Sequence, residues 1–174
     1  PSWAESIAAL YIVFLGFTIP SNYYKLTFIL NGLSSFLAHS PAIEKYTEFQ
    51  KNINFLDSIT IYWPLFSETF FNILKISDRN RSIILLSVCI SNYLVNNNFE
   101  KKLSSEISII ISVTLLSLNT FKNWDLEFLI LIISGILTKI LEERVIFEIG
   151  DEKVRVHTLW HIIGANMFKK ITEL

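Results

Sequence analysis

The chain has 174 residues and a net charge of −1, so its length predicts one domain and its charge excludes nucleic acid as the expected partner. Hydrophobic residues make up 51% of the chain and charged residues only 18%, whereas ordinary soluble domains carry about 25% charged residues. With a mean hydropathy of +0.44, the composition predicts an integral membrane protein over 1–174. Because the chain begins at Pro1 rather than Met, a short N-terminal segment is expected to precede it.

The apolar residues fall into seven blocks, some of them at the short end of the roughly 17–25 residues that span a bilayer. In chain order they cover 4–20, 23–39, 55–74, 82–95, 107–121, 126–141 and 156–171. Short polar connectors separate them, and the longest late connector, 142–153, is predicted to be a loop. Continuous apolarity favours helices over the alternating strands of a barrel. We therefore expect an all-α fold, a seven-transmembrane helix bundle, with a soluble all-helical bundle as the alternative.

Loop charge and the single cysteine add little to this fold prediction. The Lys and Arg residues divide nearly equally between alternate connectors, so the orientation and the membrane itself stay open, although Lys169-Lys170 favours a cytoplasmic C-terminus. Cys89 excludes an intrachain disulfide and is expected to be a small buried hydrophobe. Oligomeric state is not determined by these features.

All three histidines of the chain fall where helices are predicted to begin or end. His157 and His161 are four residues apart and so share a helix face at the start of the seventh block, while His39 ends the second block. Asp57 lies near the start of the third block. In an alternating bundle the end of an even helix and the start of an odd helix meet at one face. The four side chains are therefore predicted to converge.

This set of residue types suggests a metal centre. Three histidines provide three neutral nitrogen ligands and leave a fourth position open, which is the pattern of a catalytic zinc site. Asp57 would then be a general base outside the ligand set. Ser35, one helical turn before His39, would hold the reacting water or an oxyanion.

Each of these residues also has a purely structural interpretation. His39 could be an interfacial histidine, and the H-x-x-x-H pair could bind no metal. Asp57 could be an N-cap or a first-turn acid, and Ser35 could satisfy a carbonyl within its own helix. It is the combination of these residues on one face that favours a site.

Other polar and aromatic residues carry less weight in the functional interpretation. Glu68 is expected on the face of Asp57, lining an internal cavity or pairing with a polar neighbour such as Lys139. Tyr62 and Trp63 are expected to face lipid or the membrane interface. The sequence contains no phosphate loop, G-x-S-x-G elbow or dinucleotide fingerprint.

The pattern resembles the CREST superfamily of seven-span membrane hydrolases. The resemblance rests on Ser35-x-x-x-His39, Asp57 and His157-x-x-x-His161. The stretches 31–39 and 157–165 are most similar to the alkaline ceramidases. The resemblance implies Zn²⁺ held by the three histidines, with Asp57 activating the zinc water and Ser35 assisting. It further implies hydrolysis of ceramide to a sphingoid base and a fatty acid, a reaction of sphingolipid metabolism. Beside Trp3, Glu5 alone hints at the calcium segment of that branch, so calcium is not expected.

Three function classes follow from these observations. The first is a zinc-dependent lipid amidohydrolase that draws its substrate from the bilayer. The second is a non-enzymatic receptor or ligand-binding protein of the adiponectin- and progestin-receptor type, with a structural zinc whose fourth position would be closed by a protein ligand. The third is a transporter whose path is lined by Asp57 and Glu68. The open fourth position favours the first class, while the lipid and its acyl chain length are left undetermined.

Overall fold

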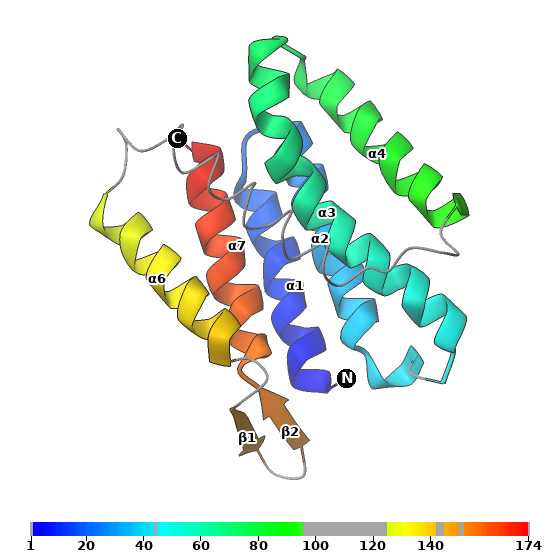
Figure 1. Cartoon of the computed structure of the whole chain (residues 1–174), viewed down its shortest axis with the longest axis vertical. Helices are drawn as coiled ribbons and strands as arrows, with labels where there is room; N and C mark the ends of the chain where they lie inside the picture. Colours follow the sequence, from blue (N-terminus) through cyan, green and yellow to red (C-terminus); the bar gives the residue numbers. More distant parts are fainter. Residues whose placement is uncertain (1, 44, 96–124, 142–144, 150–151, 174) are drawn as a thin grey trace.

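The computed structural model describes residues 2–43, 45–95, 125–141, 145–149 and 152–173 (Figure 1). These residues form mainly α-helices, so the predicted helical class is confirmed. The elements are α1 (Trp3–Thr18), α2 (Asn22–His39), the 3₁₀-helix η1 (Pro41–Ile43), α3 (Thr47–Ile73), α4 (Asp78–Val95), α6 (Leu126–Leu141), β1 (Ile146–Ile149), β2 (Glu152–Arg155) and α7 (His157–Glu173). The predicted block 107–121 lies outside the described residues. Within the described ranges, no helix combines the length and the apolar character needed to cross a membrane.

Two boundaries differ from those expected from hydropathy. Helix α3 begins at Thr47, eight residues before the apolar block 55–74, because residues 47–54 are polar yet helical. Asp57 therefore lies inside α3, and its interpretation as an N-cap or first-turn acid is wrong. The predicted loop 142–153 is also wrong in part, since β1 and β2 pair antiparallel there, with Ile146 opposite Arg155.

Neighbouring helices follow the order α6, α7, α1, α2, α3, α4 across the molecule (Figure 1). Two glycines bring α1 and α2 close together. A Cβ added to Gly16 would lie 2.8 Å from Phe28 Cβ, and one added to Gly32 would lie 2.8 Å from the Val13 backbone nitrogen. Such small residues let helix backbones approach each other. This contact places the start of α1 beside the end of α2.

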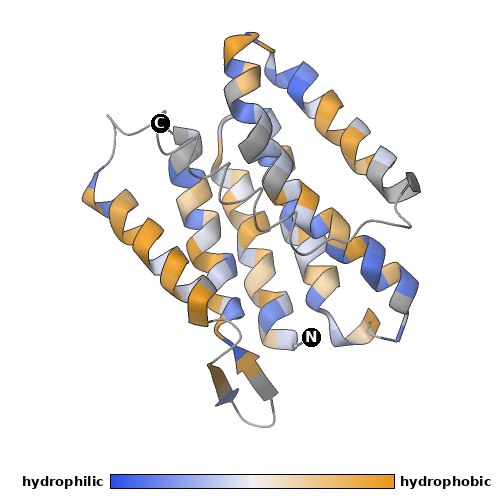
Figure 2. Cartoon of the chain, viewed as in Figure 1, coloured by the Kyte–Doolittle hydropathy of each residue, from blue (hydrophilic) through white to orange (hydrophobic). Residues whose placement is uncertain are grey.

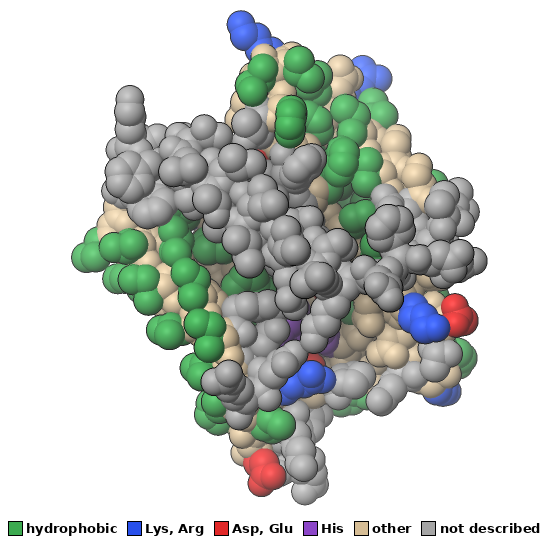
Figure 3. Space-filling model, in the orientation of Figure 1, with side chains coloured by type: hydrophobic (Ala, Val, Ile, Leu, Met, Phe, Trp, Pro, Cys, Tyr) green, Lys and Arg blue, Asp and Glu red, His purple; other side chains and the backbone are tan. Residues whose placement is uncertain are grey.

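Apolar side chains fill the contacts between these helices and also cover outer faces. One buried cluster includes Phe28 of α2 and Ala165 of α7, and another includes Leu85 and the buried Cys89 of α4. The prediction that Cys89 is buried is confirmed. Trp63, expected to face lipid or the interface, instead packs partly buried against the second cluster. The outer face of α6 is strongly hydrophobic (Figures 2 and 3).

A buried ion pair closes the corner between α3 and α4. Arg81 Nη1 donates to both carboxylate oxygens of Glu68, at 3.1 and 3.3 Å, and Nη2 donates to Asn72 Oδ1 at 2.9 Å. Its Nε donates to the Ile76 carbonyl at 2.7 Å. The partner of Glu68 is thus Arg81 rather than Lys139, whose side chain, like that of Tyr62, lies outside the described set. Glu68 therefore takes part in a packed corner through its pairing with Arg81.

Candidate metal centre

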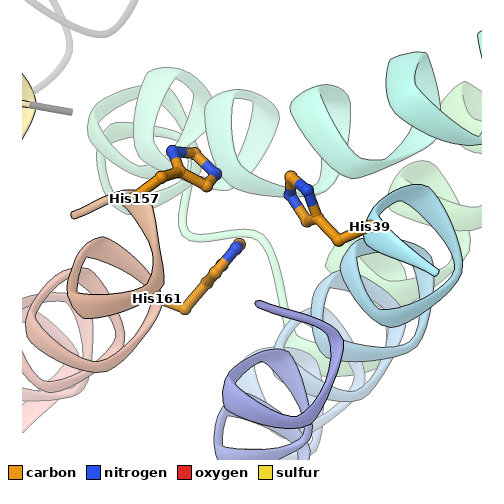
Figure 4. Close-up of side chains that lie close together, drawn as sticks. All are labelled: His39, His157 and His161. Atoms are coloured by element: carbon orange, nitrogen blue, oxygen red, sulfur yellow. The ribbon is translucent and has the colours of Figure 1, made fainter. Parts of the chain in front are cut away.

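The three histidines come together at one end of the helix bundle (Figure 4). His39 is the last residue of α2, His157 is the first residue of α7, and His161 follows one turn later. Their ring centroids lie 4.9, 4.9 and 4.8 Å apart, which makes a nearly equilateral triangle. The predicted convergence of the histidines is confirmed, whereas metal binding stays a prediction.

Local sequence explains why the histidines lie at helix ends. Helix α2 stops at His39 because Ser40 precedes Pro41, and a residue before proline is driven to extended backbone; Ser40 has φ −72° and ψ 124°. Helix α7 starts where the β1–β2 hairpin ends, and the Val156 amide donates to the Val145 carbonyl at 3.3 Å. The hairpin therefore fixes where His157 enters the site.

The donor set suits zinc. One ligand atom from each histidine lies within 4.8 Å of the other two. A tetrahedral zinc with bonds of about 2.0–2.1 Å needs nitrogens about 3.3 Å apart, so modest side-chain rotation would complete the set. In the described part of the chain this ligand group consists of the three histidines, so a bound tetrahedral metal would take its fourth ligand from outside the group.

Ser35 lies between His161 and Asp57. Its side chain is fully buried, its Oγ lies 3.3 Å from His161 Nδ1, and its hydroxyl helps to stabilise the charged form of the Asp57 carboxyl. This hydroxyl thus contacts a histidine of the triangle, while its predicted role in holding the reacting water or an oxyanion stays a prediction. The local role considered for Ser35 is filled by its neighbour Ser34, which donates to the Leu30 carbonyl at 2.8 Å.

Asp57 is held by a residue that sequence reasoning missed. Asn31 Nδ2 lies 3.1 Å from Asp57 Oδ1 and 3.2 Å from Thr60 Oγ1, and Asn31 is buried. The signal was available, because Asn31 precedes Ser35 by four residues and so shares its helix face. Asn31 and Ser35 together fix the carboxylate beside the histidines but outside the ligand group.

A second carboxylate, that of Glu5, approaches the histidines from α1. Its Oε2 lies 3.5 Å from His39 Nδ1, and its Oε1 lies 3.4 Å from Arg155 Nε. Sequence reasoning weighed Glu5 only as a trace of a calcium segment. An acid at the start of an odd helix could have been assigned to the same face as the histidines. Two carboxylates, Glu5 and Asp57, thus flank a site that would carry the positive charge of a metal.

Comparison with known proteins finds no matching family model, no matching curated protein and no matching solved structure. The CREST resemblance therefore rests on the residues quoted for it, and the function has to be argued from the geometry of this site.

Proposed function

We propose that the chain is a membrane-embedded, zinc-dependent hydrolase that cleaves the amide bond of a ceramide-like lipid. The observation that carries the proposal is the triangle of histidines whose ligand atoms lie within 4.8 Å, with Asp57 held beside it and outside the ligand group. This arrangement separates metal binding from proton transfer, as catalytic zinc sites do.

The residues around the triangle divide the work of amide hydrolysis. A zinc ion held by the three histidines would supply a Lewis acid for the amide carbonyl and an acidified water. Asp57 accepts a proton from the attacking water and returns one to the leaving amine, so that a free acid and a free amine are released. Asn31 orients this carboxylate, and Ser35 orients His161.

Outward-facing apolar side chains support a lipid environment and a lipid substrate. On α1, Phe14 and Phe17 are 64% and 67% exposed, and on α6, Leu126 is 72% exposed. Contiguous apolar surface of this kind marks a membrane or partner contact. The seven-transmembrane arrangement is part of the proposal. Helices of 16 to 18 residues, such as α1, α2 and α6, would require local thinning of the bilayer.

The receptor alternative predicts a different coordination shell. A structural zinc closes its fourth position with a protein side chain. Among the described residues the ligand group consists of histidines alone, and Asp57 is engaged by Asn31 and Ser35. These contacts favour the hydrolase.

Metal content of the detergent-purified protein is the first test. About one zinc per chain is expected by elemental analysis, lost in His39→Ala and His157→Ala and retained in the control Ser87→Ala, an exposed α4 position. The zinc protein is then assayed on a panel of ceramides and other lipid amides. Asp57→Asn should keep the metal and lose about 10²–10⁴-fold in rate, the usual contribution of a general base. Wild-type protein that holds no zinc, even after reconstitution, would refute the proposal.

A further inference from the structure

Glu5 is the most deeply buried acidic side chain near the histidines, at 1% exposure. It lies in the first turn of α1, where Ser2 Oγ caps the helix by accepting from the Glu5 amide at 3.1 Å. Within the described residues neither carboxylate oxygen of Glu5 receives a hydrogen bond, and the contacts to His39 and Arg155 are at ion-pair distance. This carboxylate is thus buried without the satisfied bonds that usually accompany burial.

The helix dipole does not explain this burial. An acid in a first turn gains from the dipole while it remains in water. Burying a carboxylate costs free energy unless paired charges or hydrogen bonds compensate it. The burial of Glu5 is therefore to be explained by its two neighbours. These are the Nδ1 edge of His39 on one side and the Arg155 guanidinium on the other.

We propose that Glu5 is the positioning residue of the metal centre, an inference that rests on the proposed zinc site. In the metal-bound centre its Oε2 would accept the Nδ1 proton of His39, 3.5 Å away in this structure, and so fix the tautomer in which Nε2 binds the metal. Metal-bound histidines commonly donate their second ring N–H to a carboxylate in this way. Glu5 acts through His39, without ligating the metal itself.

Glu5 also connects the two helices that supply the ligands. His39 ends α2, whereas Arg155 closes β2, two residues before His157 opens α7. The two oxygens of one carboxylate reach both sides, Oε2 toward His39 and Oε1 toward Arg155. Removing the carboxylate frees the histidine ring on α2 and loosens the hairpin end that places the pair on α7.

The test compares metal affinity in Glu5→Gln, Glu5→Ala and the matched control Glu48→Gln, an exposed acid of α3. Zinc affinity is measured by competition with a chromophoric chelator, and cobalt is substituted to read the ligand geometry from its visible spectrum. We expect Glu5→Ala to bind zinc about 10–100-fold more weakly, the usual effect of losing such a partner. Glu5→Gln, which keeps the shape and one acceptor, should lose less. Arg155→Ala should fall between Glu5→Gln and the unchanged control.

The outcomes separate this inference from the proposed function. If the wild type binds no zinc, the metal centre itself is wrong. If the wild type binds zinc and both Glu5 variants bind it equally well with the same cobalt spectrum, only the role of Glu5 is overturned. Circular dichroism of the metal-free variants checks that each is folded. Should Glu5→Ala fail to fold, the isosteric Glu5→Gln still decides the question.

Discussion

Two carboxylates of low exposure, Glu68 at the α3–α4 corner and Glu5 at the histidine end, differ in how their charge is compensated. At the α3–α4 corner, Glu68 receives two hydrogen bonds from Arg81, whose remaining donors reach Asn72 Oδ1 and the Ile76 carbonyl. At the histidine end, Glu5 is more deeply buried but lies only at ion-pair distance from His39 and Arg155. The Glu68 carboxylate is hydrogen-bonded by a cation, whereas the Glu5 carboxylate accepts no hydrogen bond from the described residues.

This difference suggests a structural role for Glu68 and is consistent with the proposed positioning role of Glu5. A satisfied pair needs nothing further, and removing one partner mainly costs stability. The Glu5 carboxylate is buried without hydrogen bonds from the described residues and faces His39, as the proposed positioning role requires. The transporter interpretation, which needs Glu68 to line a path, loses support because Glu68 is fully engaged with Arg81.

The largest stability effect is expected at the closed corner. Arg81→Ala leaves Glu68 buried without its partner and should lower the free energy of unfolding by about 3–5 kcal/mol. Zinc affinity of the folded variant should equal that of the wild type, because the α3–α4 corner packs near the start of α2, whereas the histidines lie at the end of α2 and on α7. Chemical unfolding in detergent measures the first quantity and chelator competition the second.

Arg79→Ala is the matched control, since Arg79 is an exposed arginine of the same helical turn. It should change stability by less than about 0.5 kcal/mol. The distinction between the α3–α4 corner and the histidine end would be wrong if Arg81→Ala and Arg79→Ala had the same free energy of unfolding, or if Arg81→Ala bound zinc more weakly than the wild type.

Gly32→Ala, at the contact between α1 and α2, is expected to lower stability less than Arg81→Ala. The new Cβ would lie 2.8 Å from the Val13 nitrogen and 3.0 Å from the Ala9 carbonyl oxygen, and backbone atoms cannot rotate away. Helices α1 and α2 must separate, at a cost of about 1–3 kcal/mol. Because Glu5 and His39 lie on these two helices, zinc affinity should fall as well, unlike in Arg81→Ala.

Gly164→Ala provides the comparison within α7. Its Cβ would come no closer than 3.5 Å, to Trp160, and alanine favours a helix over glycine by about 1 kcal/mol. Stability equal to or above that of the wild type is expected, with unchanged zinc binding. If Gly32→Ala and Gly164→Ala had the same stability and the same zinc affinity, the close approach of α1 to α2 would not determine the geometry of the histidine end.

The parts of this picture that sequence could predict are those encoded locally. The four-residue spacing of His157 and His161 fixes their shared face, and the bounds of α6 coincide with an apolar block. Spacing could have assigned Asn31 and Glu5 to the face of the histidines, but their contact partners, Asp57 and His39, depend on how α1, α2 and α3 pack, which no local pattern encodes. Hydropathy also misses the polar start of α3, because it reports burial in apolar surroundings rather than helix formation.

The pairing of Glu68 with Arg81 could not be predicted either, because it depends on the turn between α3 and α4. The turn between these helices contains Lys75 in the left-handed region, with φ 52°, and folds α4 back along α3. That turn brings Arg81 beneath Glu68. The sequence does not specify this geometry, so it predicts a cavity-lining Glu68 and a pairing with a polar neighbour such as Lys139 equally well.

The smallest effect is expected at a third polar group, where α6 and α7 meet near the C-terminal end of α7. Lys170 Nζ lies 2.9 Å from Asp125 Oδ2 and 2.8 Å from Glu127 Oε2, closer than Arg81 approaches Glu68. Both carboxylates are more than half exposed, so water and salt screen them. Lys170→Ala should therefore reduce stability less than Gly32→Ala, and the difference from wild type should shrink in 0.5 M salt, a concentration of the order that shortens the screening length to a few ångströms.

The pH dependence of this group gives a second measurement on the same variant. The Lys170 ammonium and the Phe128 amide hold the pKa of the Asp125 carboxyl below its ordinary value of about 3.9. A lowered folded pKa means that the contribution is complete above that ordinary value and is lost as the pH falls through the folded pKa. The wild type and Lys170→Ala should thus differ at neutral pH and converge in acid. A loss in Lys170→Ala as large as that in Arg81→Ala would show that contact distance, and not burial, decides the strength of these charge pairs.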